Sequence, residues 1–104
     1  MFDEKVVKKA IKGNDKAFII LMNQCKEQIY RTAFAYVKEE ETALDIVQEV
    51  VCKAYKSIEN LREPKFFNTW IMRIAINVAT DFYNKKSKVV CMEKEELLSK
   101  IDAK

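Results

Sequence analysis

The 104-residue sequence carries 19 lysine and arginine residues against 16 acidic residues, so its formal net charge is +3. It has one glycine and one proline, and this scarcity of turn residues predicts an all-α fold of one modest domain. No apolar run is as long as a membrane span, and the charged N-terminus lacks the apolar core of a signal peptide. We therefore expect a cytoplasmic protein that does not associate with a membrane.

The three cysteines, Cys25, Cys52 and Cys91, are widely spaced, and the chain has no histidine. This pattern argues against a zinc site and favours reduced thiols, with a regulatory disulfide as the alternative. No acid, base and nucleophile occur together in a pattern typical of catalysis. We therefore predict a protein that is not an enzyme and that needs no metal or other cofactor.

Two helices open the predicted fold. Residues 3–12 form a short amphipathic helix with acids first and lysines after, as the helix dipole prefers. Gly13 ends it, and Asn14 or Asp15 caps a long helix over residues 15–38. The apolar residues of the long helix form a band wide enough to contact more than one neighbour. They are Phe18, Leu21, Met22, Cys25, Ile29, Tyr30, Ala33, Phe34, Tyr36 and Val37.

A third helix starts in the acidic run at residues 39–42, with Thr42 as an alternative cap. Its apolar residues alternate steps of three and four and predict a core stripe of Leu44, Val47, Val51, Ala54 and Ile58. Another face carries Asp45, Gln48, Glu49 and Cys52. That face suits basic side chains of a protein partner, and an ordinary solvated acidic surface is the equal alternative.

Residues 59–65 form a loop around Pro64, and a helix over residues 66–88 follows. One face of this helix is a core stripe of Phe67, Ile71, Ile74, Val78 and Phe82. The other face carries Phe66, Thr69, Trp70, Arg73, Asn77, Thr80, Asn84 and Lys88. Such side chains stack on bases, pair with phosphates and bond to base edges, so this face predicts nucleic-acid binding, with a plain polar surface as the alternative.

The charges are unevenly distributed. Residues 39–49 hold five acids and no base, whereas residues 62–88 hold six bases and two acids. This asymmetry indicates two partners that carry charges of opposite sign. Beyond a domain at residues 1–88, residues 89–104 are expected to form a linker with a weak helix from Glu93 to Ile101.

Three stretches together resemble region 2 of bacterial RNA polymerase sigma factors of the extracytoplasmic-function (ECF) group. Residues 6–37 contain that group's Lys-Gly-Asp/Asn-x-x-Ala-Phe pattern, here from Lys12 to Phe18. Residues 44–55 resemble the acidic second segment, and residues 61–86 resemble the melting and recognition segments. The resemblance implies a compact bundle of three main helices plus a short N-terminal one.

The resemblance also implies the roles of individual residues. The residues expected to dock on the clamp helices of the polymerase β′ subunit are Leu44, Asp45, Gln48 and Glu49. Loop 59–67 is expected to capture a flipped base of the minus-ten promoter element on the non-template strand. The expected DNA-binding residues are Arg62, Lys65, Phe66, Asn68, Trp70, Arg73, Asn77, Thr80, Lys85, Lys86 and Lys88. An anti-sigma factor often covers these surfaces in the family and is the third implied partner.

Two features depart from the family pattern. Family members commonly end this helix with arginines, whereas the present chain ends it with lysines, which favours backbone contact over base reading. The family normally continues into a helix-turn-helix domain, so we expect the chain to be a fragment of a longer factor, its last residues leading toward an absent C-terminal domain. The alternative function is a helical protein–protein adaptor that does not bind nucleic acid.

Overall fold

The computed structural model describes residues 2–91, with side chains through Lys85. Within this part the chain forms four α-helices, α1 (Glu4–Ile11), α2 (Asp15–Val37), α3 (Glu40–Ser57) and α4 (Phe67–Cys91). Two short 3-10 turns, η1 (Ile58–Asn60) and η2 (Pro64–Phe66), lie in the connection that was predicted as an irregular loop. The all-α prediction is confirmed, and the weak helix expected from Glu93 to Ile101 lies outside the described residues.

Local polar contacts fix where the helices begin and end. The Asp3 carboxylate accepts from the Lys5 N–H at 2.9 Å and caps α1. Gly13 has a φ of +102°, a backbone conformation that residues with a side chain rarely adopt, so the chain turns there. Asn14 is the cap of α2, because its side-chain oxygen accepts from the Ala17 N–H at 2.9 Å. α3 begins in the acidic run rather than at Thr42.

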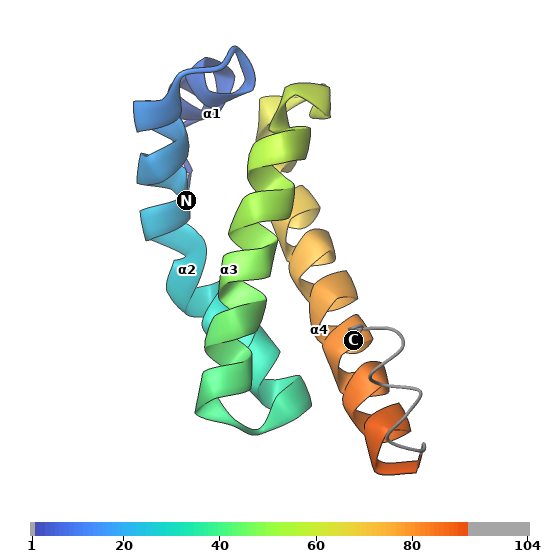
Figure 1. The fold of residues 1–104 in the computed structure, drawn as a ribbon. Coiled ribbons are helices and arrows are strands. Elements are labelled where there is room, and N and C mark those ends of the chain that lie inside the picture. The colour runs from blue at the N-terminus through green and yellow to red at the C-terminus, as the bar shows by residue number, and fades with distance from the viewer. Residues whose placement is uncertain (1, 92–104) are drawn as a thin grey trace.

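Helices α2, α3 and α4 lie side by side, and α1 crosses the end of the bundle beside the start of α2 (Figure 1). α3 contacts both α2 and α4, and α2 contacts α4, so the three long helices enclose one core. α1 also touches both 3-10 turns, which anchors the connection between α3 and α4. Within that connection Leu61 is buried and holds the intervening segment against the core.

The buried side of α3 corrects the core stripe predicted from the sequence. Its fully buried residues are Ala43, Ile46, Val50 and Ala54. Ala54 and Ile58 are buried as predicted. Leu44, which was also predicted in the core, is 48 % exposed, and Val47 and Val51 are only half-buried. Apolar residues stand next to each other at three successive turns of this helix, so the sequence permits two neighbouring stripes. The stripe with alanine at both ends faces inward, since small side chains allow close approach of the two flanking helices.

The core of α4 agrees better with the prediction. Phe67, Ile71 and Val78 are buried, and Ile74 and Phe82 are half-buried. Two alanines complete the buried side, Ala75 and Ala79. With this side turned to α2 and α3, the opposite side of α4 remains in solvent along its length.

Candidate nucleic-acid interface

The solvent side of α4 presents the polar and basic residues that the sequence predicted. Arg73 and Asn77 are exposed, and Thr80 is half-buried beside them. Trp70 is also half-buried, because its ring lies 5.9 Å from that of Phe67 at the edge of the core. Trp70 therefore contributes to packing as well as to the surface.

Two apolar side chains on this surface were not predicted. Ile76 is 42 % exposed and Tyr83 is 50 % exposed. They follow Thr69 and Arg73 at helical spacing, and Thr80 lies between them, so all five share one stripe. The sequence does contain this stripe, since Ile76 and Tyr83 follow the polar residues in the same steps of three and four. It was not recognised because apolar residues on a helix are by default assigned to the core. The Tyr83 ring lies in solvent on the same stripe as Arg73, so it is available to stack on a nucleobase.

A groove borders this surface on the side of α3, and we call it the lysine groove. It measures about 330 Å³, and its lining residues are Lys53, Lys56, Ser57, Ile74, Asn77, Val78 and Asp81. The Lys53 ammonium is 3.8 Å from the Glu49 carboxylate, at the limit of an ion pair and largely in solvent, so it stays available to another anion. These two lysines were missed because their proximity to Asn77 follows only from the packing of α3 on α4.

The connection before α4 adds further bases. Arg62 and Lys65 are exposed, as is Phe66 at 53 %. The Lys65 ammonium lies 5.3 Å from the centre of the Phe66 ring, within the range of a cation–π contact. Arg62 also shares a hollow of about 330 Å³ with Lys8 of α1 and with Lys12, which directly follows that helix. The sequence did not predict that α1 adds charge to this region, since it depends on how α1 crosses the bundle.

The other predicted DNA-binding residues lie in different places. Asn68 is exposed but faces α2, where it lines a separate hollow with Gln24 and Gln28. It is about 140° from Arg73 around the axis of α4, with half-buried Met72 and buried Ala79 between them, so the two side chains do not share a face. Lys85 is exposed near the end of the described side chains. Lys86 and Lys88 continue α4, and their side chains lie outside the described part.

The predicted polymerase-binding residues form one exposed surface on α3. Leu44 is half-exposed, and Asp45, Gln48 and Glu49 are exposed around it, so the structure brings all four together. We call these four residues the acidic face. An acidic surface with one exposed leucine is typical of a site for a partner that offers basic and apolar side chains.

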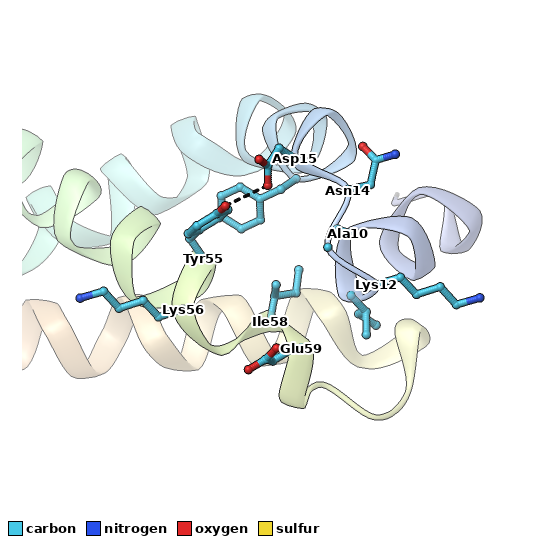
Figure 2. Close-up of a pocket in the computed structure, with 11 residues that line it drawn as sticks. Ala10, Lys12, Asn14, Asp15, Tyr55, Lys56, Ile58 and Glu59 are labelled. Carbon is cyan, nitrogen blue, oxygen red and sulfur yellow. Dashed lines mark hydrogen bonds between the residues drawn. The ribbon is translucent and has the colours of Figure 1, made fainter.

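Apolar surface continues from the acidic face toward the C-terminal end of α3. Ile19 of α2 and Tyr55 of α3 are exposed beside Val51 and Cys52, and they line a shallow hollow of about 410 Å³. Figure 2 shows the neighbouring pocket, of about 280 Å³, where the Tyr55 hydroxyl donates to the Asp15 carboxylate at 2.9 Å. The hydrogen bond to this carboxylate and its negative charge raise the pKa of Tyr55.

Among residues 2–91 there is no cluster of three or more His, Cys, Asp or Glu side chains that could hold a metal ion. Cys25 and Cys52 are free thiols, the first buried and the second exposed. None of the helices in this part of the chain is both long and apolar enough to cross a bilayer.

Comparison with known proteins gives the same assignment from independent evidence. The family model described as sigma-70 region 2 matches residues 21–89. RNA polymerase sigma factor SigV of Bacillus subtilis (strain 168) is 40 % identical over 92 residues, which cover 86 % of this chain and 55 % of that protein. The ECF RNA polymerase sigma-E factor of Escherichia coli (strain K12) is 32 % identical over 80 residues, or 77 % of this chain and 41 % of that protein.

A solved structure is similar over nearly its whole length. It is the NMR structure of an engineered region 2 of sigmaE in complex with GTAAAA, with a TM-score of 0.76 and 27 % sequence identity. The match covers 88 % of this chain and 96 % of that chain, whereas the chain spans only about half the length of the curated relatives. The resemblance noted in the sequence is thereby confirmed, and with it the prediction of a family that is not enzymatic. The chain belongs to the sigma-70 region 2 family, as found in ECF-type RNA polymerase sigma factors.

Proposed function

We propose that this chain works in transcription initiation, binding core RNA polymerase and holding the unpaired non-template strand of the minus-ten promoter element. The observation that carries the proposal is the solvent side of α4. It combines exposed Arg73 and Asn77 with the exposed ring of Tyr83, in a domain whose solved neighbour is in complex with GTAAAA. Such a role places the protein in the cytoplasm.

DNA binding divides between the helix and the connection before it. Unstacking a base costs a few kcal/mol, which contacts to the unpaired strand have to offset. Phe66, with Lys65 over its ring, is positioned to stack on an unpaired base near the start of α4. The Lys53 and Lys56 ammonium groups of the lysine groove supply charge for phosphates beside Asn77. Exposed Lys85 adds a charge farther along the helix, and Lys86 and Lys88, whose side chains are not described, are proposed to contact the DNA backbone as the family resemblance implies.

The acidic face of α3 is the proposed polymerase-binding surface. Its partner would be the basic clamp helices of the β′ subunit, with Leu44 as the apolar anchor and the acidic side chains around it setting orientation. This face and the solvent side of α4 lie on different helices, so both are available at once. An anti-sigma factor that covers either surface would block initiation.

Fluorescence of Trp70, the only tryptophan, tests the DNA-binding part directly. The chain is titrated with single-stranded GTAAAA and with permuted hexamers, each at low and high salt. Because Trp70 lies at the edge of the proposed surface, we expect its emission to change on binding. We also expect the affinity for the preferred hexamer to fall by roughly tenfold between the two salts, as phosphate contacts require. An unchanged emission with every hexamer at both salts would favour the helical adaptor.

A further inference from the structure

One ion pair joins the two surfaces that the proposed function assigns to different partners. The Glu49 carboxylate belongs to the acidic face and lies 3.8 Å from the Lys53 ammonium, and Lys53 lines the lysine groove. The two residues stand one turn apart on α3, at a spacing that places their side chains next to each other. Within the described part of the chain, no other ion pair connects the acidic face to the lysine groove.

This ion pair is weak, and both of its groups are accessible. The side chains are 52 % exposed at Lys53 and 47 % exposed at Glu49, and their separation is at the outer limit of an ion pair. Water and salt screen such a pair, so it adds little to the stability of the fold. A charge from another molecule can therefore replace either member. A basic side chain can bind Glu49, and a phosphate can bind Lys53.

The two replacements favour each other. While Glu49 faces Lys53, its negative charge attracts the ammonium and repels a phosphate that approaches the lysine groove. A basic side chain bound to Glu49 neutralises this charge, so the phosphate meets less competition and less repulsion. The same free energy acts in the other direction, because a phosphate bound to Lys53 leaves the Glu49 carboxylate more available to a basic partner.

The other charges of the lysine groove determine how large this effect is. Lys56 also lines the groove and forms no ion pair with any residue whose side chain is described. Asp81 adds one negative charge from α4, outside the acidic face. Glu49 therefore controls one of the two lysine charges that a phosphate meets there. An exposed pair of this kind corresponds to a change in affinity of about two- to threefold.

We propose that Glu49 couples the two surfaces, so that a basic partner bound to the acidic face releases Lys53 and strengthens phosphate binding in the lysine groove. This inference rests on the proposed function, since it takes core polymerase as the basic partner and the unpaired strand as the source of the phosphate. It adds that Glu49 lowers the affinity for DNA until polymerase neutralises its charge.

The first test uses the whole chain without polymerase. Glu49→Gln keeps the size of the side chain and removes its charge. Competition against a labelled copy of the hexamer that binds most tightly in the Trp70 titration gives the affinities. We expect Glu49→Gln to bind this hexamer about two- to threefold more tightly than the wild type at low salt. At high salt the two proteins should bind equally, because salt screens exposed charges.

A matched control separates this effect from a general change in net charge. Glu27→Gln removes one negative charge from another exposed ion pair, in which the Glu27 carboxylate lies 2.7 Å from the Arg31 guanidinium on α2. This pair has the same spacing along its helix, and neither residue lines the lysine groove. The affinity of Glu27→Gln for the hexamer should therefore equal that of the wild type.

Two lysine variants test whether the effect passes through Lys53. In a Lys53→Gln background, Glu49→Gln should no longer tighten binding, because the ammonium that it would release is absent. In a Lys56→Gln background, the full tightening should remain, since Lys56 is not paired with Glu49. Tightening that persisted without Lys53 would overturn the proposed coupling.

The second test adds core polymerase at a concentration that saturates each variant. Binding of the labelled hexamer is measured for each complex, with core polymerase alone as the reference. The wild type and Glu49→Gln should now bind the hexamer equally, because the partner has already neutralised Glu49. A difference that remained in the complex would show that polymerase does not bind the Glu49 carboxylate, and would overturn the coupling.

The results distinguish this inference from the proposed function. If the wild type binds the hexamer and Glu49→Gln binds it no more tightly than Glu27→Gln does, Glu49 does not couple the two surfaces, and the function proposed for α4 stands. Failure of the wild type to bind any hexamer would instead overturn that function, and this inference with it.

Discussion

At the scale of single residues, burial determines the chemistry of Cys25. The side chain is 1 % exposed between core residues of α2, and burial raises the pKa of its thiol from 9.0 to about 11. A thiol in this environment stays protonated and is a poor nucleophile and a poor disulfide partner. Cys52 lies in solvent on α3, so the two cysteines do not share one environment.

The raised pKa of Cys25 predicts how stability depends on pH. Below pH 9 the thiol is protonated in both the folded and the unfolded chain, so its contribution to stability is complete. As the pH rises from 9 toward 11, the unfolded chain loses this proton before the folded chain does, and the contribution is lost. Between pH 8 and pH 10.5, the free energy of unfolding of the wild type should fall by about 2 kcal/mol more than that of Cys25→Ala.

Urea unfolding at the two pH values measures this difference. Cys52→Ala is the matched control, and its free energy of unfolding should change with pH as that of the wild type does, because Cys52 is exposed in the folded chain. Parallel changes in the wild type and Cys25→Ala would show that the buried thiol does not contribute to the pH dependence.

At the scale of elements, α3 presents two neighbouring apolar stripes and buries only one. Ile46 is completely buried, whereas Leu44 is about half exposed on the acidic face. Ile46→Ala should therefore cost about 2–5 kcal/mol of unfolding free energy through lost burial and the cavity left behind. Leu44→Ala should cost about 1 kcal/mol or less, and circular dichroism during urea unfolding measures both. Equal losses would mean that α3 is rotated from the orientation described, with Leu44 in the core.

The helix bounds could be predicted from the sequence, whereas the contacts between helices could not. α1, α2 and α4 start and end within three residues of the predicted bounds, because caps, Gly13 and Pro64 are local signals. The inward side of α3 was predicted correctly at Ala54 and wrongly over the turns before it, because two neighbouring stripes are equally apolar there. Lys53 and Lys56 were missed because their place beside Asn77 depends on how two helices pack, which no local pattern encodes.

Trp70 shows the same limit at the candidate site. Its position on the polar stripe predicted a surface residue, and its contact with Phe67 places much of the ring against the core. Replacing Trp70 would therefore alter packing as well as the DNA surface. Arg73 and Asn77, which are both exposed, give a cleaner test of that surface.

At the scale of the whole molecule, the uneven charge of the sequence becomes two surfaces on different helices. The acidic face lies on α3, and the basic residues lie on α4, on the connection before it and at the end of α3. No residue of the acidic face lines the lysine groove, and only Glu49 touches it, through its 3.8 Å contact with Lys53. Asp45 and Gln48 can therefore be altered without changing the basic surface.

Under the proposed function, this arrangement predicts that two sets of variants separate polymerase binding from promoter opening. Asp45→Lys/Gln48→Ala should weaken capture of core polymerase about tenfold or more, because it reverses a charge and removes an amide on the acidic face, and should leave the affinity for the single-stranded hexamer unchanged. Arg73→Ala/Asn77→Ala should retain polymerase capture and abolish promoter opening, measured as permanganate reactivity of unpaired thymines. All four substituted side chains are exposed, so the melting temperatures of both variants should stay close to that of the wild type. If the α4 variant opened promoters normally while remaining bound to polymerase, the strand would have to be held by another surface. If the α3 variant captured polymerase normally, the acidic face would be only a solvated surface.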